Sequence, residues 1–264
     1  MINEYIPYEV KIIDIIKHTG KEWTFRVEDN SENVKPGQFY EISIPKYGES
    51  PISVSGIGKD YLDFTIREVG KVTNEIFKFN IGDTIRIRGP YGNGFNVKDY
   101  YDKEIIIVAG GSGLAPVRGI IEYFYENIDK CKSLTLICGF RSPEDILFKD
   151  DINRWSGKAN VILTVDKAEE GYEGRVGLVT KYIPEINIVE KENVAVIIVG
   201  PPIMMKFCIA EFQKLGIKDK DIWVSYERRM SCGLGKCGHC RMDTTYICTD
   251  GPVFNYSFGK KLYD

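Results

Sequence analysis

The chain has 264 residues, 43% of them hydrophobic, and a formal net charge of −3 from 35 basic and 38 acidic residues. This is enough apolar material for one large domain or two smaller ones. No Lys/Arg-rich block stands out, so the charge pattern argues against nucleic acid or an anionic membrane surface as a partner. The apolar runs are far shorter than the ~20 residues that cross a bilayer, and residues 1–13 lack a signal-peptide pattern. We therefore expect a cytoplasmic protein without a membrane span.

Up to about residue 90 the sequence is typical of short β-strands. Apolar and polar side chains largely alternate, and turn sequences rich in Gly and Pro separate the alternating stretches. Short strands at such regular spacing favour an antiparallel barrel. The expected strands are Tyr8–Ile16, Trp23–Val27, Phe39–Ile44, Leu62–Glu68 and Thr84–Arg88.

The pattern changes near residue 100, where continuous apolar runs alternate with helical stretches. The runs are Ile105–Ala109, Leu134–Cys138, Val161–Val165 and Val194–Val199, and the first precedes a helix expected from Pro116 to about Asn127. Strands buried on both faces that alternate with helices indicate a doubly wound parallel sheet.

The last forty residues are rich in Gly and Cys and too short to form an apolar core of their own. The predicted architecture is therefore an antiparallel β-barrel (1–98), a doubly wound nucleotide-binding α/β domain (99–222) and a small cysteine lobe (223–264). Cys131, Cys138 and Cys208 stand apart from one another, and we expect buried packing for them.

The cysteine lobe carries a C-x4-C-x2-C…C arrangement formed by Cys232, Cys237, Cys240 and Cys248. This spacing is the ligand pattern of plant-type [2Fe–2S] proteins, and the glycines between the cysteines permit close wrapping around a cluster. A structural zinc site with four thiolates is an alternative, although zinc ribbons usually pair two C-x2-C knuckles. Four unbound thiols are a further alternative.

Three glycine-containing loops follow predicted strand ends, where open α/β sheets bind ligands. Glycines permit close approach of a pyrophosphate, and N–H groups at a helix N-terminus favour an anion. Taken singly, each loop could be an ordinary turn. The candidate nucleotide contacts are Gly110, Gly111, Gly113, Leu114, Ala115 and Pro116, then Gly139 and Arg141, then Gly200, Pro201, Pro202 and Met204.

The choice between NADH and NADPH rests on the charges after the third parallel strand. Asp166, Glu169 and Glu170 discourage a 2′-phosphate, whereas Arg141 and Lys167 could attract one. We expect NADH.

In combination these motifs resemble the ferredoxin–NAD(P) reductase superfamily, and the resemblance covers almost the whole chain. The C-terminal part is similar to the subgroup with a terminal [2Fe–2S] lobe, which includes the electron-transfer subunits of dihydroorotate dehydrogenase and of anaerobic sulfite reductase. The fuller match is to the family of anaerobic sulfite reductase subunits. Its motifs are Ser50–Ser55, Val69–Thr73, Tyr226–Met230 and Asp250–Tyr256.

The resemblance implies FAD in the barrel. Pro51, Ile52, Ser53 and Val54 would line the isoalloxazine, with the Ser53 hydroxyl near the reactive nitrogen as the candidate catalytic group. The ribityl and phosphate groups would lie against Ile66, Arg67, Gly70, Val72 and Thr73.

The chain departs from the superfamily pattern at two positions. Ser50 stands where many members place the Arg that pairs with the flavin pyrophosphate, and we predict that Arg67 compensates. Val199 replaces a Cys that several relatives carry near the nicotinamide. Hydride transfer needs orientation and no protein nucleophile, so the change affects the fine positioning of the nicotinamide and not the activity itself.

The predicted function is an NADH-oxidising electron-transfer subunit that uses FAD and a [2Fe–2S] cluster. The resemblance implies a sulfite-reducing partner with sirohaem and iron–sulfur subunits, because this chain has no ligands left for sirohaem. Two alternatives remain: the equivalent subunit of dihydroorotate dehydrogenase, and a non-enzymatic, zinc-stapled nucleotide sensor.

Overall fold

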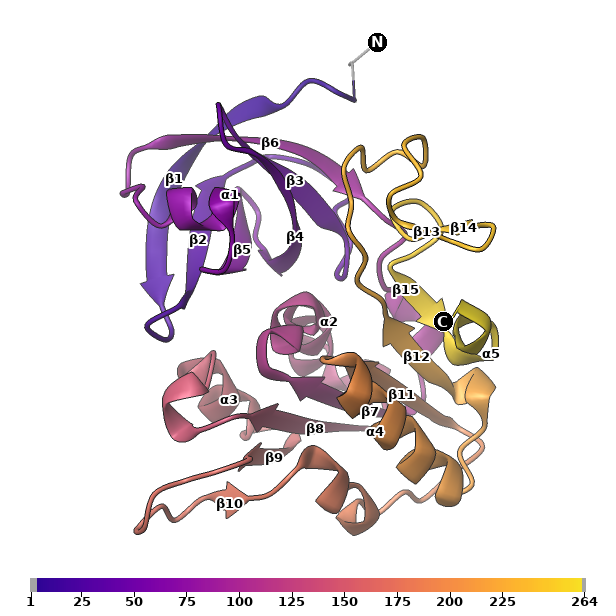
Figure 1. Cartoon of the computed structure of the whole chain (residues 1–264). Helices are drawn as coiled ribbons and strands as arrows, with labels where there is room; N and C mark the ends of the chain where they lie inside the picture. Colours follow the sequence, from indigo (N-terminus) through magenta and orange to yellow (C-terminus); the bar gives the residue numbers. More distant parts are fainter. Residues whose placement is uncertain (1–3, 263–264) are drawn as a thin grey trace. The chain divides into compact units, whose positions relative to one another are not determined.

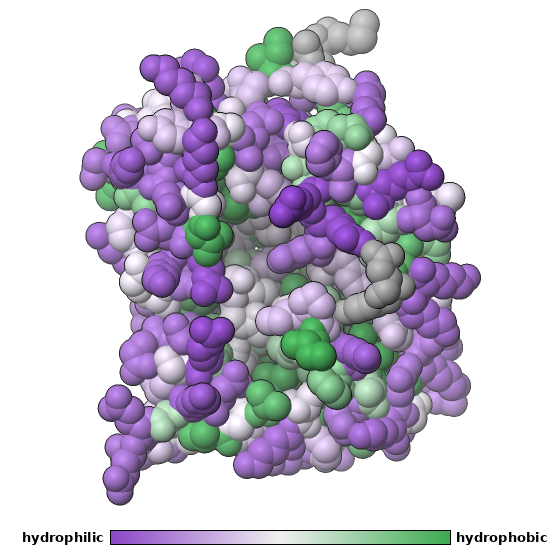
Figure 2. All heavy atoms as spheres, viewed as in Figure 1, coloured by the Kyte–Doolittle hydropathy of each residue, from purple (hydrophilic) through white to green (hydrophobic). Residues whose placement is uncertain are grey.

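The computed structural model describes residues 4–262 and divides the chain into two compact units. The barrel unit is Met1–Phe95 with Tyr226–Val253, and the sheet unit is Asn96–Ser225 with Phe254–Asp264. Between residues 4 and 262 no helix has the length and hydrophobicity needed to cross a membrane. Hydrophilic side chains cover most of the face in Figure 2, with hydrophobic ones in small separate groups.

Six strands form the closed barrel, in the order β1-β2-β5-β4-β3-β6, and every neighbouring pair is antiparallel. This confirms the predicted barrel. The strand β4 was not among the expected ones, and the short helix α1 lies close to it and to β3 (Figure 1). The bounds are β1 (Tyr8–Lys17), β2 (Glu22–Glu28), β3 (Phe39–Ile44), β4 (Gly48–Ile57), β5 (Tyr61–Arg67), β6 (Thr84–Tyr91) and α1 (Lys71–Ile76).

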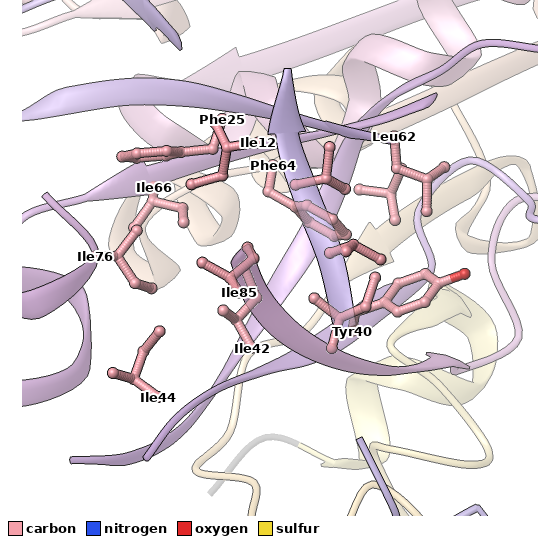
Figure 3. Packing of buried hydrophobic residues seen from close by; sticks show 14 residues of the cluster. Ile12, Phe25, Tyr40, Ile42, Ile44, Leu62, Phe64, Ile66, Ile76 and Ile85 are labelled. Carbon is pink, nitrogen blue, oxygen red and sulfur yellow. The ribbon is translucent and has the colours of Figure 1, made fainter. Parts of the chain in front are cut away.

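The barrel interior is filled by aliphatic and aromatic side chains that alternate along the strands. Figure 3 shows side chains from the barrel strands and from α1 pointing toward one another. Each fully buried side chain of this size contributes about 1.5–3 kcal/mol relative to exposure. The labelled members are Ile12, Phe25, Tyr40, Ile42, Ile44, Leu62, Phe64, Ile66, Ile76 and Ile85.

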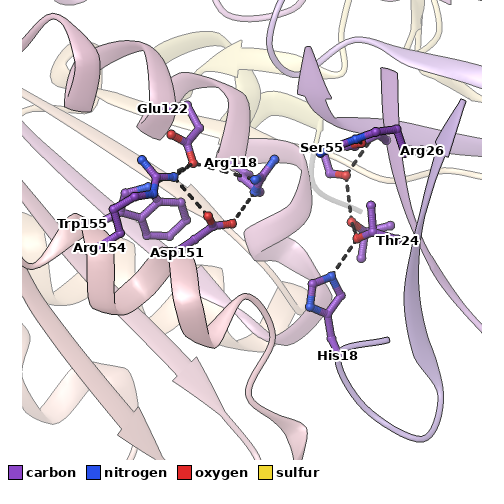
Figure 4. Close-up of polar contacts among 11 residues, drawn as sticks. His18, Thr24, Arg26, Ser55, Arg118, Glu122, Asp151, Arg154 and Trp155 are labelled. Carbon is purple, nitrogen blue, oxygen red and sulfur yellow. Dashed lines mark hydrogen bonds and ion pairs between the residues drawn. The ribbon is translucent and has the colours of Figure 1, made fainter. Parts of the chain in front are cut away.

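A row of hydroxyl groups links neighbouring barrel strands (Figure 4). His18 Nε2 lies 2.7 Å from Thr24 Oγ1, which lies 2.7 Å from Thr65 Oγ1. The Thr65 hydroxyl donates to Ser55, whose own hydroxyl donates to the carbonyl of Asp63. Ser55 lies at a register shift between β4 and β5, so its bonds satisfy polar groups where the ladder is interrupted.

The sheet unit is built on the order β10-β9-β8-β7-β11-β12-β15, with parallel pairing from β10 to β12. The four predicted parallel strands are present, which confirms the nucleotide-binding type of fold. The strands are β7 (Glu104–Gly110), β8 (Ser133–Phe140), β9 (Asn160–Val165), β10 (Arg175–Val176), β11 (Val194–Val199), β12 (Ile222–Ser225) and β15 (Val253–Asn255).

The helices of this unit are α2 (Leu114–Glu126), α3 (Lys149–Trp155), α4 (Pro202–Lys214) and α5 (Tyr256–Gly259). The strand order reverses at β7, which lies between β8 and β11. Because parallel crossovers are right-handed, this reversal places α2 and α3 on one face of the sheet and α4 on the other (Figure 1). A ligand is expected at the carboxyl ends of β7 and β11.

Helices α2 and α3 are joined by a cluster of ion pairs (Figure 4). Arg118 Nε donates to Asp151 at 2.7 Å, and Arg154 donates to both Asp151 and Glu122. The indole N–H of the fully buried Trp155 also donates to Glu122, at 3.1 Å. These contacts fix α3 against the helix that begins at the glycine loop.

Two glycines in the loop before α2 provide a matched test of its packing. A Cβ on Gly113 would lie 2.7 Å from the Val199 carbonyl and 2.8 Å from Gly200 Cα, whereas a Cβ on Gly111 meets nothing within 4 Å. We expect Gly113→Ala to lower the free energy of unfolding by about 2–3 kcal/mol, because the backbone of Val199 and Gly200 must move to make room for the new methyl group. Gly111→Ala costs about 1 kcal/mol for its positive φ alone. Urea unfolding measures both, and equal effects would contradict the packing described here.

Candidate cofactor sites

The four clustered cysteines all lie in the barrel unit, three of them within residues 232–240 and the fourth at 248. Four thiolates are the ligand number that a two-iron cluster requires. Within residues 4–262 no group of three or more His, Cys, Asp or Glu is gathered around the position of a single metal ion.

Backbone N–H groups of the same loop are directed at the sulfurs. Leu234, Lys236 and Cys237 donate to Cys232 Sγ at 3.3, 3.4 and 3.5 Å, and Gly235 donates to Cys248 Sγ at 3.2 Å. Such donors stabilise negative charge on thiolates and on cluster sulfurs. The donor set therefore fits an iron–sulfur cluster. The three remaining cysteines, Cys131, Cys138 and Cys208, are buried as expected.

The cysteine lobe is attached to the barrel through the turn after β6. Asn93 donates from its amide to the carbonyls of Val253 and Asp250 at 2.7 and 3.1 Å. Its backbone N–H donates to Gly251 O at 2.7 Å, and its side-chain oxygen accepts from Val253 N at 3.2 Å. One residue thus fixes the segment that follows the last cysteine, and the sequence did not single it out.

A buried arginine of β6 holds the beginning of the cluster loop. Arg88 donates to the carbonyls of Ser231 and Cys232 at 2.8 and 2.6 Å, and to the Tyr91 hydroxyl at 3.0 Å. Its Nε also donates to Glu49 at 3.0 Å. No sequence motif pointed to these contacts, and the one to Cys232 joins residues 144 positions apart.

Glu41 on β3 is a buried carboxylate beside this arginine. It is opposite Arg88 on β6 and Pro51 on β4, it is 0% exposed, and neither oxygen has a hydrogen-bond partner among residues 4–262. Burial raises the pKa of Glu41 to about 7, and the charge of Arg88 opposes that rise. A glutamate in an alternating strand normally indicates the solvent face, so the sequence did not single it out.

The nucleotide loops meet at the switch point of the sheet unit. Gly110 ends β7, and a Cβ there would lie 2.4 Å from Met204 Sδ and 3.3 Å from Pro201 Cδ. Gly113 lies against Val199 and Gly200, so these glycines allow the two loops to touch each other. Gly111 is the open position where a ligand can approach the backbone.

The remaining predicted contacts of the first loop belong to the helix start and its core. Pro116 is in the first turn of α2, as predicted, and Leu114 and Ala115 are buried with it. Because their side chains are buried, Leu114 and Ala115 can contact a nucleotide only through their backbone. Pro201 is the N-cap residue of α4, and Pro202 is its first residue.

The loops after β8 and β9 are hydrogen-bonded to each other. Asp166 N donates to Phe140 O at 2.8 Å, and Lys167 N donates to Arg141 O at 3.1 Å. Burial raises the pKa of Asp166, while Arg141 and Lys167 lower it. Gly139 on β8 lies against Val179, whose Cγ1 is 2.3 Å from the position of an added Cβ, so that glycine has a packing role.

The predicted flavin contacts all lie on β4, β5 and the start of α1. Pro51, Ile52 and Ser53 are partly exposed on β4, whereas Val54 and Ile66 are buried in the barrel core. Val54 and Ile66 can therefore contact a flavin only through their backbone.

The phosphate end of the predicted flavin site is partly occupied by contacts within the chain. The Thr73 hydroxyl accepts from the N–H groups of Val69 and Gly70 at 3.1 and 2.9 Å, and so caps α1. Arg67 is half exposed, and its Nε lies 3.1 Å from Glu22. A pyrophosphate at Arg67 would thus compete with that carboxylate.

Comparison with known proteins agrees with this geometry. Residues 107–209 match the oxidoreductase NAD-binding domain family, and residues 227–257 match the iron–sulfur cluster binding domain of dihydroorotate dehydrogenase B. Sulfhydrogenase 1 subunit gamma of Pyrococcus furiosus is 36% identical over 96% of this chain and 92% of its own length. A probable electron-transfer subunit of dihydroorotate dehydrogenase B from the same organism is 34% identical over 90% of this chain and 85% of its own.

The chain belongs to this family of electron-transfer subunits. It is an oxidoreductase subunit of the ferredoxin–NADP reductase-like superfamily, and its cofactors are NADH, FAD and an iron–sulfur cluster. A solved NADH-dependent reduced ferredoxin–NADP oxidoreductase has a TM-score of 0.79 at 27% identity, over 94% of this chain and 88% of that one. The cytochrome b5 reductase domain of Ulva prolifera nitrate reductase shares the fold, with a TM-score of 0.70 at 16% identity over 85% of this chain and 99% of that domain.

Substitution of the cysteines separates cluster ligands from packing residues. We expect Ser at any of Cys232, Cys237, Cys240 or Cys248 to abolish the iron–sulfur absorption of this electron-transfer subunit and to leave bound FAD. Ala at the buried Cys131, Cys138 or Cys208 should leave both cofactors. Iron, sulfide and flavin content of anaerobically purified variants measures this. Full cluster content in any one of the four Ser variants would show that the cysteine replaced there is not a cluster ligand.

The raised pKa of Glu41 makes stability depend on pH in a defined direction. A carboxyl whose pKa is higher in the folded state than in the unfolded state stabilises the fold most below pH 4.5, and this contribution is lost as the pH rises through about 7. The free energy of unfolding should therefore fall between pH 5 and pH 8 by on the order of 2–3 kcal/mol more in wild type than in Glu41→Gln. Urea unfolding at each pH measures this, and parallel pH profiles would contradict it.

Proposed function

We propose that this subunit oxidises NADH through FAD and passes electrons singly, through a [2Fe–2S] cluster, to a partner subunit. The observation that carries the proposal is the set of backbone N–H groups directed at the sulfurs of Cys232 and Cys248, in the same unit as the flavin-type barrel. FAD exchanges two electrons with the nicotinamide as a hydride and one at a time with the cluster, so it converts between the two kinds of transfer.

The protein's own residues bind and orient these groups. Residues 1–98 hold the flavin, with the Ser53 hydroxyl beside its reactive nitrogen, and residues 223–264 hold the cluster. Residues 99–222 hold the nicotinamide cofactor at Gly111, where the backbone is open to approach. Gly200, whose φ is +156°, lets the loop after β11 pass close to Gly110. Hydride transfer depends on this orientation.

NADH is proposed over NADPH because of the charges after β9. Asp166 lies in the loop that is hydrogen-bonded to Phe140 and Arg141, and Glu169 and Glu170 follow it. A carboxylate at this position suits a ribose 2′-hydroxyl and repels a 2′-phosphate. Arg141 and Lys167 are the opposing charges.

The proposed electron acceptor is a sulfite-reducing partner with sirohaem and iron–sulfur subunits. The motifs Ser50–Ser55 and Tyr226–Met230 support this assignment, because they are similar to the electron-transfer subunit of anaerobic sulfite reductases. The likeness to sulfhydrogenase gamma subunits, 36–38% identical, supports an electron-transfer role within a multi-subunit complex.

Dihydroorotate dehydrogenase is the second candidate for the complex. The match of residues 227–257 to the cluster domain of that enzyme, and relatives 30–34% identical, favour it. Co-purification of a sirohaem protein with the tagged subunit supports the first candidate, and co-purification of an FMN-containing barrel supports the second.

The visible absorption spectrum of the anaerobically purified subunit tests the proposed reaction. Flavin and iron–sulfur bands should both be present and should bleach when NADH is added. A subunit that binds flavin but holds no cluster after anaerobic reconstitution would contradict the role given to the four cysteines. Colourless protein with stoichiometric zinc would instead support the alternative function, a zinc-stapled nucleotide sensor.

Arg67 is the proposed partner of the flavin pyrophosphate. Arg67→Ala should weaken FAD binding about 10- to 100-fold, because a charge-assisted contact is worth about 1.5–3 kcal/mol. Arg86→Ala is the matched control, since Arg86 is a similarly exposed barrel arginine whose partner is Glu9, at 2.9 Å. Titration of apoprotein with FAD, followed by flavin fluorescence, measures both. Unchanged affinity in Arg67→Ala would contradict the assignment.

A further inference from the structure

Arg88 makes several contacts that are unusual for a residue outside the predicted sites. It is 4% exposed and bonds to Glu49 on β4, to Tyr91 on its own strand and to two consecutive carbonyls of the cluster loop. Arg86, two residues earlier on the same strand, differs from it. Its ion pair is with Glu9, and its side chain is 48% exposed.

The contacts of Arg88 reach a proposed cluster ligand directly. Nη1 donates to the carbonyl of Cys232 at 2.6 Å, and Nη2 donates to the carbonyl of Ser231 at 2.8 Å. The Cys232 sulfur in turn accepts the N–H groups of residues 234, 236 and 237. The guanidinium therefore fixes the peptide groups before and after Cys232, and the loop's own N–H groups hold its sulfur.

Tyr91 completes the attachment beside Arg88. A Cβ on Gly233 would lie 2.8 Å from the Tyr91 ring, so this glycine, with φ +73°, allows the ring to pack directly on the loop backbone. The Tyr91 hydroxyl accepts from Arg88 at 3.0 Å and donates to Glu4 O at 2.8 Å. Arg88 and Tyr91 together hold residues 231–233 against β6.

The same arginine is connected to the proposed flavin segment through the barrel strands. Glu41 of β3 is paired with Arg88 on one side and with Pro51 on the other. Glu49, which Arg88 bonds, is two residues before Pro51 on β4. Arg88 is therefore linked to the segment expected to line the isoalloxazine in two ways, by strand pairing through Glu41 and by its hydrogen bond to Glu49.

We propose that Arg88 is a positioning residue that fixes the cluster ligand Cys232 relative to the flavin-binding strand β4, and so sets the rate of electron transfer from flavin to cluster. The inference rests on the proposed function, because it takes Cys232 as a ligand and β4 as a flavin site. In this role Arg88 contacts neither the flavin nor the cluster and acts only through Cys232. The planar guanidinium fork matters here, because one group must reach two carbonyls, a hydroxyl and a carboxylate at once.

Arg88→Lys is the informative variant. Lysine keeps the positive charge beside Glu41 and Glu49, so folding is preserved, but its single ammonium cannot hold both carbonyls as the fork does. Arg86→Lys is the matched control on the same strand. Arg88→Gln removes the charge as well, and it separates the geometric contribution from the electrostatic one.

Two measurements on the cofactor-loaded subunit test the inference. The first is the electron paramagnetic resonance spectrum of the dithionite-reduced cluster, which requires neither NADH nor flavin. The second is rapid mixing with NADH, followed at flavin and cluster wavelengths. In Arg88→Lys we expect changed g values, an unchanged rate of flavin reduction and cluster reduction at least about tenfold slower, since small displacements of reacting groups cost large factors in rate.

The outcomes separate this inference from the proposed function. Wild-type g values and a wild-type rate of cluster reduction in Arg88→Lys would overturn the positioning role. Loss of the cluster from Arg88→Lys protein that retains FAD would support it, because the loop is then no longer held in its binding conformation. Failure of NADH to bleach the wild-type subunit would instead count against the proposed function, while the dithionite spectra would still decide the role of Arg88.

Discussion

Residues 226–253 are too few to bury an apolar core, so the proposed cluster site depends on what holds this segment in place. Its strands are two residues long, and most of its side chains around the cysteines are exposed or only partly buried. The barrel provides the support, through Asn93 at the end of the segment and Arg88 at its beginning. A cluster bound by four thiolates would close the loop between these two points, as structural metal sites do in small domains.

This way of holding the lobe requires charge inside the protein. Arg88 and Glu41 are buried, and taking such groups out of water costs free energy. An apolar contact could stabilise the lobe, but it could not fix the orientation of two peptide carbonyls. The buried arginine is therefore better explained by the geometry it imposes than by any gain in stability.

Much of the fold followed from local patterns, because those patterns report burial directly. Continuous apolar runs such as Val194–Val199 correspond to strands buried on both faces, and the cysteine spacing placed four thiols in one loop. The strand β4 was missed because Pro51 and several small polar residues interrupt its pattern. Its place in the barrel is set by pairing with β3 and β5, which local sequence does not encode.

The contacts that connect the sites could not be predicted in the same way. Arg88 and Glu41 occupy polar positions of alternating strands, where solvent is the usual neighbour, yet both are buried, and Arg88 bonds a residue 144 positions away in the sequence. The glycines of the loop before α2 pointed to a nucleotide, yet Gly113 also has a packing role, because a Cβ there would lie within 3 Å of the loop after β11. Of the three glycines in this loop, only Gly111 has open space around it. The tertiary structure therefore reduces the candidate nucleotide contacts among them to one.

The central claim is that electrons reach the cluster from NADH only by way of the flavin. Its most direct test is the spin-quantified resonance signal of the cluster after anaerobic addition of NADH, compared between FAD-loaded and FAD-stripped subunit. We expect a cluster signal in proportion to bound FAD, and no signal in FAD-stripped protein whose cluster is still reduced by dithionite. A cluster that NADH reduces without FAD, or one that stays oxidised while the flavin is reduced, would contradict it.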